Sequence, residues 1–247
     1  MKRIFFISFI LFLSTYLFAQ KVTIKPGDYN NHKYFSLYQL KKTDGTTYKR
    51  ETVFNITKKG NQYNIDIESI KDYVLDVPEY KTLNISLIIY TVLQETNIEF
   101  IVKEKTQLRI SNIAELTNKC LELSIKWKES IPLSQEGWRN TISNVILEIC
   151  KGIFHDIILF QNEYEIDKEN ELNTRLGLRI VYYTINLAQQ RNKYLMDFII
   201  DSRNKNEIYQ SKGKLEINQK KLLVTKYSEE ISGIKLDHTI SYDLKQL

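Results

Sequence analysis

The sequence contains little proline, glycine, cysteine or histidine. Its 247 residues include three prolines, eight glycines, two cysteines and three histidines, against 43% hydrophobic residues. This balance excludes a collagen-like or disordered chain and favours a packed core. No two histidines lie four residues apart, and there is no C-x-x-C pair. We therefore expect no metal site and no cofactor.

Catalytic signatures and a strong charge bias are also missing. The sequence has no G-x-S-x-G elbow, no H-E-x-x-H and no glycine-rich phosphate loop. Lys and Arg number 35 against 30 Asp and Glu, with both signs interspersed along the chain. An even mixture of this kind gives no basis for a nucleic-acid partner. The sequence leaves catalysis open but favours a protein without it, and no catalytic residue is assigned.

The N-terminus has the pattern of a cleavable secretory signal. Positive charge at Met1-Lys2-Arg3 precedes a largely apolar run over 4–18, and Ala19 precedes Gln20. The apolar run, about 15 residues, is shorter than the roughly 20 that a spanning helix needs. We predict a signal peptide at 1–19, a single secreted α+β domain at 20–247, and no integral membrane segment after cleavage. The expected location is periplasmic or extracellular.

The two cysteines leave a disulfide open. An oxidising compartment permits a bond between Cys120 and Cys150, which both fall on predicted helices. Measured from the turn near Pro132, the two positions differ by an axial offset of about 9 Å, which is more than a relaxed disulfide tolerates. The alternative is two separate buried thiols.

Alternating polar and apolar residues predict an antiparallel sheet. The first strands are expected at 34–41, 46–57 and 62–67, with tight turns at Asp44-Gly45 and Gly60-Asn61. The apolar run 83–93 has Leu, Ile, Tyr and Val at both odd and even positions, which predicts a strand covered on both faces. Later strands are expected over 98–102, 107–110, 174–187 (with a bulge), 194–200, 214–217, 222–227 and 233–244.

Helical spacing dominates the middle of the chain. The segment from Asn112 to Phe160 predicts a helical hairpin, with Ser111 or Asn112 capping the first helix and Ser134 capping the second. The fold class expected is α+β, a predominantly antiparallel sheet of about ten strands packed on a central helical hairpin. This plan is similar in architecture to periplasmic proteins that cradle a lipid or peptide on a curved sheet, which does not by itself establish function.

Two ionisable residues fall in phase with apolar neighbours. Asp156 lies on the apolar face of the central helix, where a carboxylate needs a partner such as Arg175 or Arg179. His238 shares the parity of the apolar residues of the last strand. Either could act as a base. We favour structural alternatives for both residues. For Asp156, the helix changes direction after Gly152; for His238, the side chain is a hydrogen-bonded core histidine.

Aromatic residues of the late strands suggest a ligand surface. Tyr182, Tyr194 and Phe198, together with His238 and Asp156, are the candidate ligand-binding residues for a lipid, peptide or glycan. The leading hypothesis is a secreted or periplasmic non-catalytic binding protein that cradles an apolar or amphipathic ligand. The alternatives are a hydrolase using Asp156 or His238 and a cell-envelope or surface protein-interaction module. The oligomeric state is left open.

Overall fold

The computed structural model describes residues 20–24, 32–75, 83–103, 107–128, 133–150, 162–176, 179–204, 207–220, 224–232 and 238–247. The strands are β1 (Lys21–Thr23), β2 (His32–Lys42), β3 (Thr47–Lys59), β4 (Gln62–Leu75), β5 (Ile98–Lys103), β6 (Gln107–Ile110), β7 (Glu163–Glu165), β8 (Glu169–Leu176), β9 (Arg179–Gln190), β10 (Lys193–Asn204), β11 (Glu207–Asn218), β12 (Val224–Ser232) and β13 (His238–Gln246). The helices are α2 (Leu83–Glu95), α3 (Ile113–Lys126) and α4 (Gln135–Ile149). The predicted signal peptide, 1–19, lies outside the described residues.

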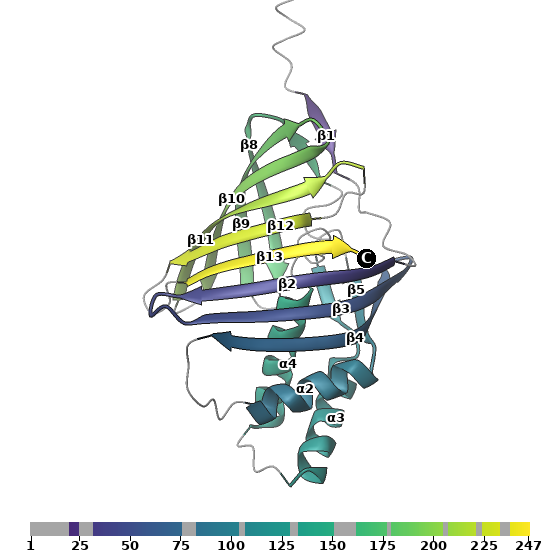
Figure 1. Cartoon of the computed structure of the whole chain (residues 1–247). Helices are drawn as coiled ribbons and strands as arrows, with labels where there is room; N and C mark the ends of the chain where they lie inside the picture. The colour runs from purple at the N-terminus through teal and green to yellow at the C-terminus, as the bar shows by residue number, and fades with distance from the viewer. Residues whose placement is uncertain are drawn as a thin grey trace, which may run out of the picture.

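Eleven strands form one antiparallel sheet in the order β6-β5-β4-β3-β2-β13-β12-β11-β10-β9-β8, and β1 pairs with β7 separately. The last strand, β13, lies beside β2, so the two halves of the chain meet in the middle of the sheet (Figure 1). Together with the helices, this arrangement confirms the predicted α+β class. Tight turns at Gly45 and Gly60, with φ of 88° and 62°, join β2 to β3 and β3 to β4.

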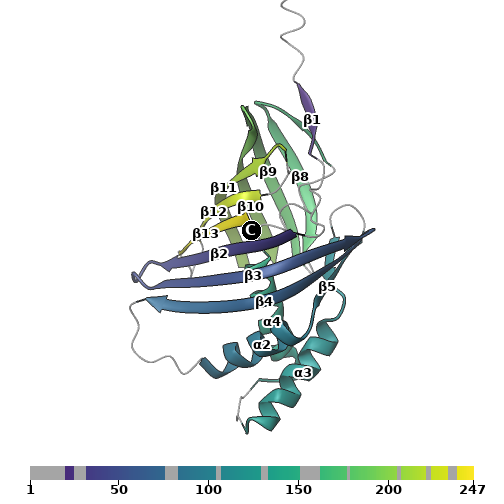
Figure 2. The ribbon, with the colours of Figure 1, turned by 45° about the vertical axis from the view of Figure 1, so that its right-hand side comes forward.

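The sheet is strongly curved, and the helices gather at one end of it. Helix α2 packs mainly on β4, α4 packs on β2, and α3 packs on both helices. Figure 2 shows α2 and α3 below β4, with α4 continuing behind the strands, while β8 to β12 rise away from α2 and α3. The edge strands β6 and β8 come within 8 Å of each other between Cα atoms. Within the described residues, no helix is long and apolar enough to cross a membrane.

A row of directly opposed residues crosses eight strands on the concave face. In sheet order from β4 to β9 this inner row is Asp72, Arg50, Tyr38, Tyr242, Tyr227, Leu215, Met196 and Leu187. All of them except Asp72 are buried. The row therefore changes from charged, near the helices, through tyrosine to apolar at the far end.

Gly213 of β11 makes room for an aromatic ring on this face. It lies opposite Phe198 of β10, and a Cβ at this position would overlap the Phe198 ring and approach the Ser228 carbonyl oxygen to 2.5 Å. The Phe198 ring stacks on Tyr227, with centroids 5.6 Å apart and planes at 27°. Only glycine allows the ring to lie flat over the strand.

Two predicted strands are wrong. The run predicted as a strand at 83–93 is helix α2, which buries Ile88, Ile89, Val92 and Leu93 at helical spacing and leaves Leu87 51% exposed. The single bulged strand predicted at 174–187 is the hairpin of β8 and β9. The phase change after Tyr182 lies within β9, where Tyr182 is exposed and Tyr183, Ile185 and Leu187 are buried.

The helical hairpin is confirmed, with differences at its ends. Ser134 caps α4 as predicted, accepting a hydrogen bond from the Gly137 amide at 3.1 Å. Asn112 makes no side-chain cap on α3 and instead accepts from the Glu99 amide at 3.1 Å. Helix α4 ends at Ile149, and the rest of its predicted length, 151–160, lies outside the described residues.

Cys120 and Cys150 are free thiols, and both are buried. Of the two arrangements that the sequence left open, the structure has two separate thiols. Burial raises the pKa of the Cys120 thiol to about 12 and raises that of Cys150 as well.

Candidate functional site

A buried ion cluster joins the helices to the sheet. The Arg50 guanidinium of β3 is 4% exposed and donates to Asp72 of β4 at 2.8 Å through Nε, to Glu148 of α4 at 2.6 Å and to Tyr90 of α2 at 2.6 Å. It also donates to the Tyr48 hydroxyl, and the hydroxyls of Tyr48 and Tyr90 both donate to Asp72. We call these five residues the Arg50 cluster. It links two strands and two helices through one cation.

The Arg50 cluster is closed to a ligand because its polar atoms satisfy one another. Burial raises the pKa values of Tyr48 and Tyr90, which keeps both hydroxyls protonated as donors. Burial alone would lower the pKa of Arg50, but the surrounding oxygen atoms raise it well above its ordinary value. A charge that is paired and hydrogen-bonded in this way positions the elements around it.

A buried carboxylate lies farther along the concave face. Glu229 of β12 is 6% exposed and accepts a hydrogen bond from the Tyr227 hydroxyl. Burial and the Glu229 charge together raise the pKa values of Tyr227 and Tyr183. Tyr242 donates to the Ile149 carbonyl oxygen at 3.3 Å, tying β13 to the end of α4. The middle of the concave face is therefore polar but enclosed.

An open site occurs where β12 and β13 part. Their pairing ends with Lys226 opposite Asp243, although β13 continues beside β2 as far as Gln246. The cause is a register shift between β11 and β12, in which Thr225 is the extra residue. Its hydroxyl donates to the Glu216 carbonyl oxygen at 3.1 Å. A bulge bends its strand and increases the twist, so β12 turns away from β13 at this point.

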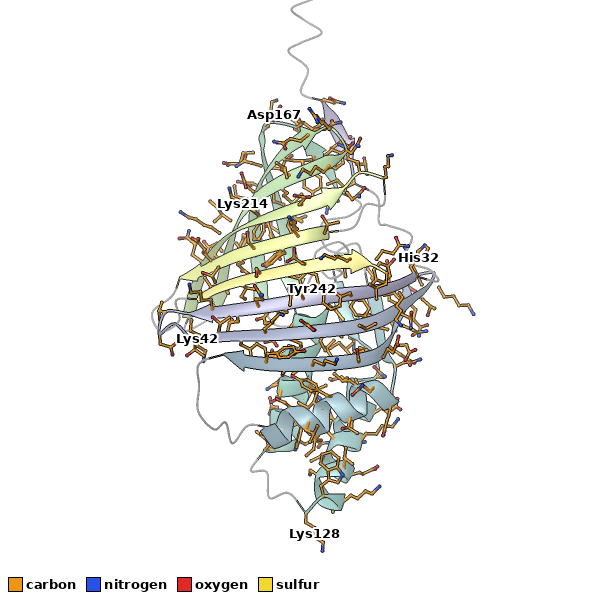
Figure 3. The ribbon with its side chains drawn as sticks, viewed as in Figure 1. His32, Lys42, Lys128, Asp167, Lys214 and Tyr242 are labelled. Atoms are coloured by element: carbon orange, nitrogen blue, oxygen red, sulfur yellow. The ribbon has the colours of Figure 1, made fainter. Side chains whose placement is uncertain are left out.

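The gap opens into a cavity of about 870 Å³, which we call the β12–β13 cleft. Its described lining comprises Gln190, Arg191, Asn192, Lys193, Glu216, Asn218, Thr225, Lys226, Asp243, Leu244 and Lys245. It lies at the end of the sheet where β2 begins with His32, the opposite end of β2 from Lys42 (Figure 3). Leu244, which is 4% exposed, belongs to the hydrophobic core, so the cleft runs from the outer surface to the edge of that core.

The cleft carries an excess of two positive charges, from four cationic and two acidic lining residues. Lys193 is paired with Glu216 at 2.9 Å. Arg191, Lys226 and Lys245 are exposed and form no ion pair within 4.0 Å with any described residue. Unlike Arg50, these three cations face solvent and are available to a ligand.

Of the residues that the sequence grouped, the three whose side chains are described differ in exposure. Tyr182 is 44% exposed, whereas Phe198 is buried and Tyr194 is half-buried against the core. His238 begins β13, with its backbone opposite Lys42 and Ile231; its side chain lies outside the described part. Asp156 also lies outside the described residues. None of these predicted residues is among those that line the described cleft.

Comparison with known proteins gives a distant structural likeness. No protein-family model matches the chain, and no curated protein matches it. A solved structure described as "Lipid-protein interactions in lipovitellin" matches 91% of this chain and 25% of that chain, with 11% identity and a TM-score of 0.47. The chain thus spans a quarter of the length of that protein. A TM-score below 0.5 at this identity does not establish a common fold.

Proposed function

We propose that the protein is a secreted or periplasmic non-catalytic binding protein that holds an amphipathic ligand in the β12–β13 cleft. The observation that carries this proposal is the continuity of the cleft, which joins an exposed polar rim to Leu244 of the core. Its volume, about 870 Å³, is in the range of small-molecule sites.

The two parts of the cleft suit the two parts of such a ligand. An apolar segment would gain by leaving water against Leu244 and the methylene stem of Lys245. A polar segment would remain at the rim, among side chains that can donate or accept hydrogen bonds. The described lining thus offers hydrogen-bonding groups at the rim and an apolar contact at the core, the two features that support binding of such a ligand.

Export is the other half of the proposal and rests on the N-terminal pattern alone. If the full sequence is expressed with its own leader, the exported protein should begin at Gln20. N-terminal sequencing of the protein recovered from the periplasm or medium tests this directly. Retention of residues 1–19 on the recovered protein would overturn the predicted cleavage.

Ligand binding is tested with a neutral apolar fluorophore, N-phenyl-1-naphthylamine, and by native mass spectrometry of the exported protein. We expect saturable fluorescence enhancement and a non-covalent adduct that is lost on denaturation. Thr225→Tyr, which places an aromatic ring in the cleft, should weaken probe binding about tenfold or more by steric overlap with the bound probe. Thr184→Tyr on β9 is the matched control and should bind as the parent does. Absence of probe binding by the parent protein would overturn the proposal.

A further inference from the structure

The rim of the β12–β13 cleft draws its cations from three separate elements. Lys226 comes from β12, Lys245 from β13, and Arg191 from the two-residue turn between β9 and β10. Arg191 adopts a φ of 45°, which favours glycine, yet the residue here is arginine. The rim is therefore assembled by the tertiary fold rather than by one run of basic sequence.

The acidic residues of the cleft do not neutralise this rim. Glu216 is engaged by Lys193, and Asp243, which lies opposite Lys226, forms no ion pair within 4.0 Å with a described residue. Asp243 reduces the excess of positive charge and would repel a heavily charged ligand. One compact anionic group, with one or two negative charges, matches this arrangement.

The apolar contact lies deeper than the charges. Leu244 is buried at the edge of the core, whereas the three cationic residues are exposed. A ligand that uses both must place its anionic group outward and its hydrocarbon part inward. Lysine side chains suit the boundary, because their stems pack on apolar surface while their ammonium groups stay in water.

We infer that the β12–β13 cleft binds a single-chain anionic amphiphile, with a carboxylate or phosphate monoester held by Lys226, Lys245 and Arg191 and the chain directed toward Leu244. This inference rests on the proposed function and specifies the chemistry of its ligand. Carboxylate and phosphate share the feature that matters, anionic oxygens that accept charge-assisted hydrogen bonds.

The test is displacement of N-phenyl-1-naphthylamine by decanoate, decyl phosphate, 1-decanol and decyltrimethylammonium, each below its micelle concentration. Decanoate and decyl phosphate should displace the probe at about tenfold lower concentration than 1-decanol, the effect of one charge-assisted hydrogen bond. Added salt should reduce this advantage, because exposed charges are screened.

Matched lysine variants test which side chains give the preference for an anionic head group. Lys226→Met and Lys245→Met keep an apolar stem and remove the charge, so each should weaken decanoate binding about fivefold and affect 1-decanol binding less than decanoate binding. Lys212→Met, an exposed lysine of β11 outside the cleft lining, should change neither.

The possible outcomes separate the two proposals. Equal displacement by 1-decanol and decanoate, or stronger displacement by decyltrimethylammonium, would overturn the anionic preference while leaving amphiphile binding intact. Unchanged decanoate binding in both lysine variants would also overturn it. If the probe does not bind the parent protein, the proposed function fails. If the probe binds and neither decanoate nor decyl phosphate displaces it, the anionic amphiphile is overturned.

Discussion

Two regions of this sheet place a basic residue directly opposite an acidic one on the neighbouring strand, with different results. Arg50 lies opposite Asp72 near the helices, and Lys226 lies opposite Asp243 at the parted end of β12 and β13. The first pair is closed, with 2.8 Å between nitrogen and oxygen, and the arginine side chain is 4% exposed. In the second pair Lys226 is exposed and Asp243 is half-buried, and the two form no ion pair within 4.0 Å.

The covering helices account for the difference. Tyr90 of α2 and Glu148 of α4 reach Arg50 and complete its hydrogen bonds. A charge enclosed by such partners holds elements together, and removing it leaves the partners unsatisfied. At the cleft, the described helices do not contribute to the lining, and the charges remain hydrated. The same residue types therefore act as a structural clamp at one end and as a candidate binding rim at the other.

Of the changes that distinguish the two regions, alkaline pH should have the largest effect on stability. Burial raises the pKa values of six tyrosines, namely Tyr38, Tyr48, Tyr90, Tyr164, Tyr183 and Tyr227. The described cleft lining contains no tyrosine. In the unfolded chain these groups lose their protons above about pH 10, whereas the folded chain keeps them. Their contribution to stability is complete below that pH and falls as the pH rises.

Each such group should reduce the free energy of unfolding by about 1.4 kcal/mol per pH unit above that point. We expect cooperative alkaline unfolding, with tyrosinate absorbance from the buried set appearing together with the loss of far-ultraviolet ellipticity. Complete ionisation of all tyrosines in a protein that keeps its native ellipticity would contradict this prediction.

Arg50→Met should have the next largest effect. It leaves Asp72 and Glu148 without their cation, and the free energy of unfolding should fall by about 3–5 kcal/mol. Urea denaturation measures the change. Lys49→Met, at the adjacent position in a half-exposed pair with Glu51, is the control and should cost no more than about 1 kcal/mol. Equal effects of the two substitutions would mean that Arg50 is not a clamp.

Gly213→Ala tests the apolar part of the concave face, on β11, which follows β12 in the sheet order. A methyl group here meets the Phe198 ring and the Ser228 carbonyl oxygen, so the free energy of unfolding should fall by about 1–3 kcal/mol. Gly137→Ala in the first turn of α4 meets only the flexible side chains of Leu133 and Ser134, at 3.3 Å or more, and should be neutral or slightly stabilising. Unchanged stability in Gly213→Ala would indicate that Phe198 moves aside without cost.

Local patterns predicted the early strands and the cap at Ser134 because their signals are short-range: alternation, turn glycines and one hydroxyl. They failed at 83–93, where a dense apolar run fits either a doubly covered strand or a buried helix. Helix α2 buries Ile88 and Ile89 together, which alternation cannot represent. Packing on β4 stabilises the helix over the strand, and this contact cannot be identified from the sequence alone.

The functional residues were harder to predict. Arg50 shares the parity of buried Phe54 and Ile56 in β3, so the sequence did carry a signal for a buried cation, and it was missed. Its partner Glu148 lies 98 residues away, which no local pattern can identify. The cleft depends on the register of β11 against β12 and on the pairing of β13 with β2. Both pairings are set by the tertiary structure. From the sequence alone, Lys226 and Lys245 have the pattern of ordinary surface residues.

Lys226→Met should have the smallest effect on stability and is therefore the sharpest check of the comparison. The side chain is exposed and unpaired among the described residues, so the free energy of unfolding should change by less than about 0.5 kcal/mol in urea denaturation. A loss approaching that of Arg50→Met would show that Lys226 holds β12 against β13, and the two regions would then differ only in exposure. An unchanged stability combined with weaker decanoate binding would mean that the charge contributes to the ligand rather than to the fold.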